Sequence, residues 1–226
     1  MSKRSFAIGD IHGCARTLRQ LLKVLGLAKT DTVYLLGDYI DRGPDSRGVI
    51  ETILRMQEEG FDLRPIYGNH EEMLLLAIES TGVFELIEWL EQGGAATLKS
   101  YGVSQPQDIP RAHLDFMESL PLFRMTDSFV FVHAGLDFTI DDPFSAVGRN
   151  AMLWDRSGKV VPAKIGGRKV VSGHCTQTLD DIKKSLKNDH LRIDNGCVYG
   201  AESPGLGNLV ALHLETGALI VQEKID

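Results

Sequence analysis

The segment Thr32–Gly43 (TVYLLGDYIDRG) joins a run of apolar and β-branched residues to a group of acidic residues bounded by glycines. Such a run predicts a buried strand, so the acids are expected in the loop where that strand ends. Three other segments repeat the pattern, namely Ser5–Gly13 (SFAIGDIHG), Leu63–Glu71 (LRPIYGNHE) and Phe129–Gly135 (FVFVHAG). A fifth, Lys169–His174 (KVVSGH), adds one more histidine. Because ligands of open α/β sheets bind at the carboxyl ends of strands, the pattern predicts an α/β fold with a polar site at that edge.

The side chains expected at these strand ends are of the types that hold divalent metals. They are Asp10, His12, Asp38, Asn69, His133 and His174. Carboxylate and amide oxygens and imidazole nitrogens bind borderline cations. Two ions about 3.5–4 Å apart grip a phosphoryl group and activate a water molecule, which requires one carboxylate that reaches both ions. Asp38 is the natural candidate, and the pattern predicts a two-metal phosphoesterase.

The five blocks, in this order, resemble the metal-dependent phosphoprotein phosphatase family, whose members share the calcineurin-like metallophosphoesterase fold. The resemblance is strongest to the phage-lambda-type and bacterial serine/threonine protein phosphatases. It implies that one divalent ion is held by Asp10, His12 and Asp38, and a second by Asp38, Asn69, His133 and His174. We expect Mn²⁺, with Fe or Zn as alternatives, because mixed nitrogen and oxygen ligands do not select one metal by affinity alone.

The same resemblance assigns roles in the reaction. His70 would be the general acid that protonates the leaving oxygen, and Asp41 its carboxylate partner. The substrate phosphate would be bound by Arg42, Arg156, Asn69 and His70. The implied reaction removes phosphate from phosphoserine or phosphothreonine, with phosphotyrosine and phosphohistidine as further substrates, by direct attack of a metal-bridging hydroxide.

The resemblance also implies an architecture of two mixed β-sheets packed as a sandwich, with helices on the outside. The residue pattern by itself predicts only an α/β fold with an additional antiparallel part. We expect the strand–helix alternation to stop after His133, and the segments 137–149 and 157–168 to be loops. Because the metal-ligand blocks extend from residue 10 to residue 174, the chain 1–226 is expected to form a single domain.

Two residues depart from the phage-type pattern. Tyr67 stands where the phage-type enzyme has an arginine, which removes one cation from the expected rim of the site. We expect Tyr67 and the loop Asp137–Arg149 to form part of that rim. Cys175 follows the last histidine, where threonine is usual. A buried, inert thiol is the simpler interpretation of Cys175, with redox sensitivity as the alternative.

The composition agrees with an ordinary enzyme. The chain has 226 residues, 43% of them hydrophobic, which is enough for one complete core. A net charge of -7 argues against a nucleic-acid or membrane partner. Three cysteines do not form a disulfide framework, so we expect a cytoplasmic location. We also expect a monomer, with a phosphorylated protein or peptide as its partner.

Three functions compete. Protein phosphatase is favoured by Glu71, because symmetrical bis(5'-nucleosyl)-tetraphosphatases usually have aspartate after the block Gly68–His70. It is also favoured by the few cations expected at the rim besides Arg42 and Arg156, since a tetraphosphate needs several. Symmetrical tetraphosphatase is the alternative. A non-catalytic binding module is the third, and it gives no reason to gather so many costly polar groups.

Overall fold

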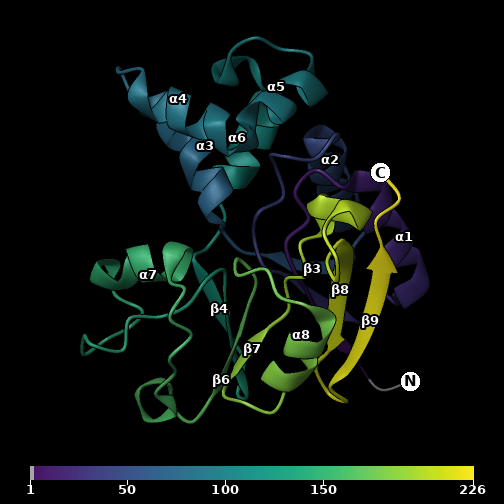
Figure 1. Cartoon of the computed structure of the whole chain (residues 1–226), viewed down its shortest axis with the longest axis vertical. Coiled ribbons are helices and arrows are strands. Elements are labelled where there is room, and N and C mark those ends of the chain that lie inside the picture. Colours follow the sequence, from purple (N-terminus) through teal and green to yellow (C-terminus); the bar gives the residue numbers. More distant parts are fainter. Residues whose placement is uncertain (1–2) are drawn as a thin grey trace.

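The chain folds into two mixed β-sheets with helices around them (Figure 1). A computed structural model describes residues 3–226, with the side chains of residues 201 and 202 excepted. In the order of their hydrogen bonding, the strands of the first sheet are β3 (Asp62–Pro65), β2 (Thr32–Leu35), β1 (Ser5–Ile8), β8 (Asn208–His213) and β9 (Ala218–Glu223). Those of the second are β4 (Phe123–Met125), β5 (Phe129–Val132), β6 (Lys169–Ser172) and β7 (His190–Arg192).

Each sheet combines parallel and antiparallel pairs. In the first, β1, β2 and β3 are parallel, and β8 and β9 extend the sheet in antiparallel pairs. In the second, β5, β6 and β7 are parallel and β4 is antiparallel to β5. The carboxyl ends of six strands are thereby available to the same side of the molecule. The predicted fold class is confirmed.

Alternation along the strands shows that the two sheets pack face to face. On β1, Ala7 belongs to one buried cluster, whereas its neighbours Phe6 and Ile8 belong to another. The cluster of Ala7 also contains Tyr34 from the first sheet and Phe131 from the second, and their rings stack with centroids 3.8 Å apart. Because successive side chains of a strand point to opposite faces, this cluster is the layer between the sheets.

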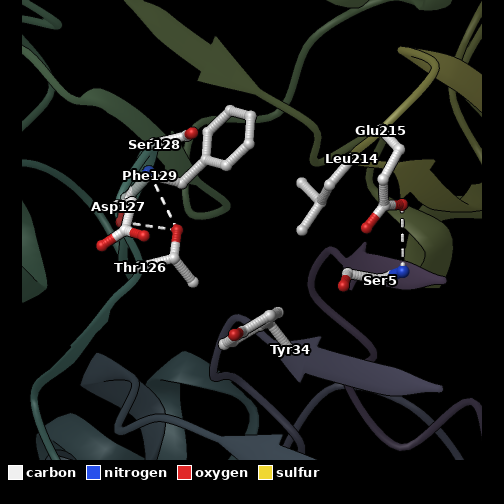
Figure 2. A pocket seen from close by; sticks show the side chains of 8 residues that line it. All are labelled: Ser5, Tyr34, Thr126, Asp127, Ser128, Phe129, Leu214 and Glu215. Carbon is white, nitrogen blue, oxygen red and sulfur yellow. Dashed lines mark hydrogen bonds between the residues drawn. The ribbon is translucent and has the colours of Figure 1, made fainter. Parts of the chain in front are cut away.

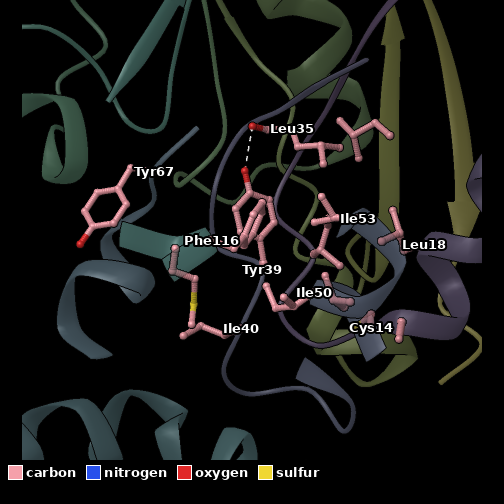
Figure 3. Packing of buried hydrophobic residues seen from close by; sticks show 14 of the residues in the cluster. Cys14, Leu18, Leu35, Tyr39, Ile40, Ile50, Ile53, Tyr67 and Phe116 are labelled. Carbon is pink, nitrogen blue, oxygen red and sulfur yellow. Dashed lines mark hydrogen bonds between the residues drawn. The ribbon is translucent and has the colours of Figure 1, made fainter. Parts of the chain in front are cut away.

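Helices cover the outer faces. The helices are α1 (Ala15–Leu25), α2 (Ser46–Glu58), α3 (Asn69–Glu79), α4 (Phe84–Trp89), α5 (Ala95–Tyr101), α6 (Arg111–Glu118), α7 (Arg149–Trp154) and α8 (Leu179–Ser185). Helix α1 packs on β8 and β9, and α2 on β3, while α3 to α6 form a separate helical group at the top of Figure 1. Figure 3 shows part of the other buried cluster, which also contains Phe6 and Ile8. In this cluster the Tyr39 hydroxyl donates a hydrogen bond to the Leu35 carbonyl. No helix in the described part of the chain has the length and hydropathy needed to cross a bilayer.

The expectation that strand–helix alternation stops after His133 was wrong. Helix α8 lies between β6 and β7, which are parallel, so the two strands and the helix form another βαβ unit. Helix α8 has only seven residues, and Leu179 and Ile182 give too short an apolar pattern for recognition. Helix α7 begins at Arg149, the last residue of the segment expected to be a loop, and was not predicted. Both helices matter for function, because they follow strands whose carboxyl ends face the site.

Candidate active site

Four of the predicted metal ligands form a tight group. His133 Nε2 lies 2.7 Å from Asn69 Oδ1, 3.2 Å from His174 Nδ1 and 3.4 Å from Asp38 Oδ1. The His174 Nδ1 atom is also 3.1 Å from Asn69 Oδ1. These atoms come from loops after β2, β5 and β6 and from the first residue of α3, so both sheets contribute to the group.

Backbone carbonyls determine which imidazole nitrogens face the site. His133 Nδ1 donates to the Leu36 carbonyl at 2.7 Å, and His12 Nδ1 donates to the Ile40 carbonyl at 2.9 Å. A carbonyl can only accept, so each Nδ1 carries a proton and each Nε2 is the nitrogen that faces the site. Hydrogen bonds of this kind are the usual way in which proteins orient metal-binding histidines.

Asp10 lies beside this group rather than within it. Its Oδ2 atom accepts the His174 backbone N–H at 2.9 Å, which joins the loop after β1 to the loop after β6. Its Oδ1 atom is buried without a hydrogen-bond donor among the described residues. A Cβ atom at Gly173 would overlap this oxygen, so only glycine leaves space for the Asp10 carboxylate. The closest acidic and imidazole atoms around Asp38 come instead from His12 and His70 on one side and from His133 and His174 on the other.

The donor set fits divalent cations. Burial, and after it the charge of His70, lowers the pKa of His12 to about 3. Burial and the charge of His133 lower the pKa of His174 to about 3 as well. Both imidazoles are therefore neutral at pH 7, as metal binding requires. For Asp38, burial raises the pKa, but His133 and His70 outweigh it and hold the pKa below its ordinary value. The site thus combines the buried Asp38 carboxylate, the nitrogens of neutral imidazoles and an Asp10 oxygen that has no hydrogen-bond donor among the described residues. A bound cation would stabilise this group of electron-rich atoms.

His70 and Asp41 form a hydrogen-bonded pair. His70 Nδ1 lies 2.7 Å from Asp41 Oδ2, and the Asp41 carboxylate also accepts from Trp89 Nε1 at 2.9 Å and from Thr97 Oγ1 at 2.6 Å. Burial lowers the pKa of His70, but Asp38 and Asp41 together raise it above its ordinary value. A positioned imidazole that retains a proton can act as a general acid.

Sequence reasoning missed the residues that hold this pair. Trp89 is fully buried at the end of α4, and Thr97 is buried in α5. Both belong to the helical group above the sheets, about 50 residues along the chain from Asp41. No motif marks them, because a tryptophan and a threonine in helical segments are normally interpreted as packing residues.

Glu71 also has a role that the sequence did not reveal. Its carboxylate is buried and accepts the backbone N–H groups of Asp38 at 3.0 Å, Tyr39 at 2.8 Å and Gly68 at 3.1 Å. It thereby fixes the loop after β2 to the start of α3. Glu71 is a positioning residue, because it acts through the backbone of Asp38.

Strained backbone is concentrated at the site. Among the described residues, the non-glycine residues with positive φ are His12, Asp38, Asp41, Arg42 and His174. Such conformations cost about 1–3 kcal/mol each and persist only where the surrounding structure imposes them. All five had been predicted from the sequence as site residues, which associates the strain with function.

The predicted phosphate-binding arginines lie near different predicted metal ligands, Arg42 near His12 and Arg156 near His174. Arg42 is exposed, and its Nη1 atom donates to His12 Nε2 at 3.0 Å. Its backbone N–H donates to the carbonyl of Gly93, where a Cβ atom would crowd the Arg42 backbone. Arg156 is also exposed, and its charge contributes to lowering the pKa of His174, after burial and His133.

Tyr67, which was expected at the rim of the site, packs against Arg149. The residue belongs to a buried cluster, with 7% of its surface exposed, and the guanidinium of Arg149 lies over its ring at 5.4 Å from the centroid. Arg149 belongs to α7 and is exposed. The position that lacks the phage-type arginine is thus covered by Arg149, the last residue of the distant loop that was also expected at the rim.

A hollow of about 460 Å³ lies at the opposite ends of the strands (Figure 2). It is lined by Ser5, Tyr34, Thr126, Asp127, Ser128, Phe129, Leu214 and Glu215. Ser5 begins β1 and Phe129 begins β5, whereas the predicted ligands follow the carboxyl ends of these strands. None of the predicted site residues lines this hollow.

Comparison with known proteins agrees with this geometry. Residues 4–199 match the family described as calcineurin-like phosphoesterase. The chain is 34% identical over 133 residues to a symmetrical bis(5'-nucleosyl)-tetraphosphatase of Nitrosomonas europaea, which covers 58% of this chain but only 44% of that relative. It is 28% identical over 222 residues to the asymmetrical bis(5'-nucleosyl)-tetraphosphatase PrpE of Bacillus velezensis, covering 88% of this chain and 86% of the relative.

The fold is also that of a protein serine/threonine phosphatase from Saccharomyces cerevisiae, with a TM-score of 0.64, 16% identity, and coverage of 99% of this chain and 81% of the other. The chain is therefore a member of the calcineurin-like metallophosphoesterase family, as the sequence predicted.

Proposed function

We propose that the protein hydrolyses bis(5'-nucleosyl) tetraphosphates with the aid of two bound divalent cations. The observation that carries this proposal is the similarity to the Bacillus velezensis tetraphosphatase over 88% of this chain and 86% of that one. Relatives with the symmetrical activity in their names match a shorter part of the chain, and the chain spans less than half their length. The relatives thus favour the substrate class that the sequence had placed second.

The described residues can take the roles that this reaction needs. The proposed ligands are Asp10, His12 and Asp38 for one ion, and Asp38, Asn69, His133 and His174 for the other. Bound divalent ions, with Mn²⁺ expected, supply a nucleophile at neutral pH and neutralise phosphoryl charge. His70, oriented by Asp41, donates a proton to the leaving phosphate oxygen. Arg42 and Arg156 bind phosphoryl oxygens, and these contacts strengthen as charge develops in the transition state.

Protein phosphatase is the second candidate. Glu71 favours it, because the resemblance associates glutamate at this position with protein phosphatases. The position of Glu71 is compatible with either function, since its buried carboxylate already accepts hydrogen bonds from backbone N–H groups. A non-catalytic module is disfavoured, because buried carboxylates and strained backbone would be retained without benefit.

A substrate panel with Mn²⁺-reconstituted protein tests the proposal. Diadenosine tetraphosphate, phosphoserine and phosphothreonine peptides, and p-nitrophenyl phosphate are compared by kcat/KM, with nucleotide products separated by chromatography. We expect the highest value for diadenosine tetraphosphate. Two ADP would define symmetrical cleavage, and ATP with AMP would define asymmetrical cleavage. A higher kcat/KM for phosphopeptides would overturn the proposal, and Asp38→Asn should abolish every activity that belongs to this site.

A further inference from the structure

Arg149 is held in place by two neighbours, Tyr67 and Glu72, at the edge of the candidate site. Its guanidinium lies over the Tyr67 ring at 5.4 Å, a distance at which cation and aromatic face attract each other. Its Nε and Nη2 atoms donate to Glu72 Oε1 at 3.2 and 3.0 Å. Glu72 Oε2 in turn accepts from Trp154 Nε1 at 3.2 Å. We call Tyr67, Glu72, Arg149 and Trp154 the α3–α7 ladder.

The ladder adjoins the proposed metal ligands at both ends. Glu72 is three residues beyond Asn69 on α3, so the two side chains lie on neighbouring positions of one helix face. At the other end, the Trp154 ring meets the His174 ring edge to face, with centroids 6.2 Å apart. Figure 3 shows the hydroxyl end of Tyr67 turned away from the neighbouring core residues Phe116 and Tyr39. The ladder therefore forms a wall that extends outward from the metal-ligand group.

Arg149 retains the capacity to bind a ligand. Its side chain is 44% exposed, whereas that of Glu72 is 17% exposed. Glu72 takes two of the five N–H groups of the Arg149 guanidinium, and the Tyr67 hydroxyl is also within hydrogen-bond reach, which still leaves N–H groups for a ligand. A guanidinium with two nitrogens fixed by a carboxylate has lost its rotational freedom before a ligand arrives, so little entropy is lost when a phosphate binds.

We propose that Arg149 binds the phosphate chain of the substrate beyond the phosphoryl group that is cleaved. The proposal rests on the function proposed above and specifies its substrate as a polyphosphate. With one phosphoryl group at the metal-ligand group, the remaining phosphates of a tetraphosphate must extend along the surrounding surface. Arg149 offers them a charged, planar donor on the wall formed by α3 and α7. A monoester has no phosphate to place there. Tyr67 and Glu72 are positioning residues that hold Arg149.

Competitive inhibition tests the proposal without requiring that the tetraphosphate be cleaved. Hydrolysis of p-nitrophenyl phosphate by the Mn²⁺-loaded protein is measured with two inhibitors, inorganic phosphate and a methylene-bridged diadenosine tetraphosphate analogue. Arg149→Ala should raise the inhibition constant of the analogue about tenfold and that of phosphate less than twofold. Arg149→Lys should restore part of the loss, because the charge remains while the fork is lost. Arg55→Ala is the matched control, since Arg55 is an exposed, ion-paired arginine near the end of α2, on the side of the molecule where β3 begins.

A binding measurement provides an independent readout. Trp154 bonds to Glu72 within the ladder and Trp89 bonds to Asp41 of the candidate site, so titration with the analogue should change the tryptophan emission. The change should require a higher analogue concentration in Arg149→Ala. An equal rise in both inhibition constants, or unchanged analogue binding, would overturn the role of Arg149. If the analogue binds tightly and its binding depends on Arg149, but the protein does not hydrolyse the tetraphosphate, the proposed function is refuted. The role of Arg149 in binding a phosphate chain would then still stand.

Discussion

Replacing Glu71 by glutamine should destabilise the protein and weaken metal binding together. The Glu71 carboxylate accepts the N–H groups of Asp38 and Gly68 through Oε2, and those of Tyr39 and Ile40 through Oε1. Glutamine has nearly the same shape but offers an NH₂ donor in place of one oxygen. In either orientation of the amide, two of the four backbone N–H groups face a donor in a buried environment.

The size of the effect follows from the number of lost acceptors. A buried donor left without a partner costs about 1–3 kcal/mol, so two of them cost about 2–6 kcal/mol. This is a large part of the stability of a typical domain, which is about 5–15 kcal/mol. The Asp38 loop should also lose its alignment, and Mn²⁺ affinity should fall by at least tenfold.

Urea unfolding of the metal-free protein and calorimetric titration with Mn²⁺ measure the two effects. Glu79→Gln is the matched control, because Glu79 is exposed on the same helix and the substitution should change stability by less than about 0.5 kcal/mol. If Glu71→Gln behaved like this control in both assays, the assignment of Glu71 as the residue that positions Asp38 would be incorrect.

Three other predictions concern metal, proton transfer and pH. EDTA should abolish hydrolysis of p-nitrophenyl phosphate and added Mn²⁺ should restore it, with Asp38→Asn the most damaging ligand substitution; full activity in excess EDTA would contradict the metal assignment. His70→Asn should lower kcat by roughly 10²–10⁴-fold on alkyl phosphates and less on p-nitrophenyl phosphate, whose leaving group needs little protonation; equal losses would exclude His70 as the acid. Hydrogen bonds from Arg4 lower the pKa of Asp31 to about 2, so this carboxylate stabilises the fold above pH 4 and the contribution is lost as the pH falls from 4 towards 2. Asp31→Asn should therefore cost about 1–2 kcal/mol at pH 6, allowing for solvent screening at the half-exposed Arg4, and almost nothing at pH 2, as measured by urea unfolding.

Much of the candidate site could be predicted from short segments, because its chemistry depends on residues next to strand ends. The blocks around Asp10, Asp38 and His133 each follow a strand that the apolar pattern identifies, and their residue types restrict the possible chemistry. No long-range information is needed to propose their side chains as metal ligands. The positive φ angles of Asp38 and His174 could not be predicted, since no property of a single residue indicates them.

Segments distant in the sequence could be assigned only from the structure. Trp89 and Thr97 reach Asp41 because the helical group packs above the loop after β2. Arg149 covers Tyr67 because α7 is placed next to α3 by the second sheet. Neither neighbour has a local pattern that differs from ordinary packing or surface residues.

The sequence by itself determined the class of protein, the metal-ligand residues to consider and the alternation of strands and helices in the first half of the chain. These features are local, since strand periodicity and strand-end polarity are encoded within about ten residues. The packing of the two sheets, the support of the His70–Asp41 pair and the position of Arg149 depended on the tertiary structure. They arise from contacts between segments that are far apart in the chain, and such contacts form only when apolar faces are buried together.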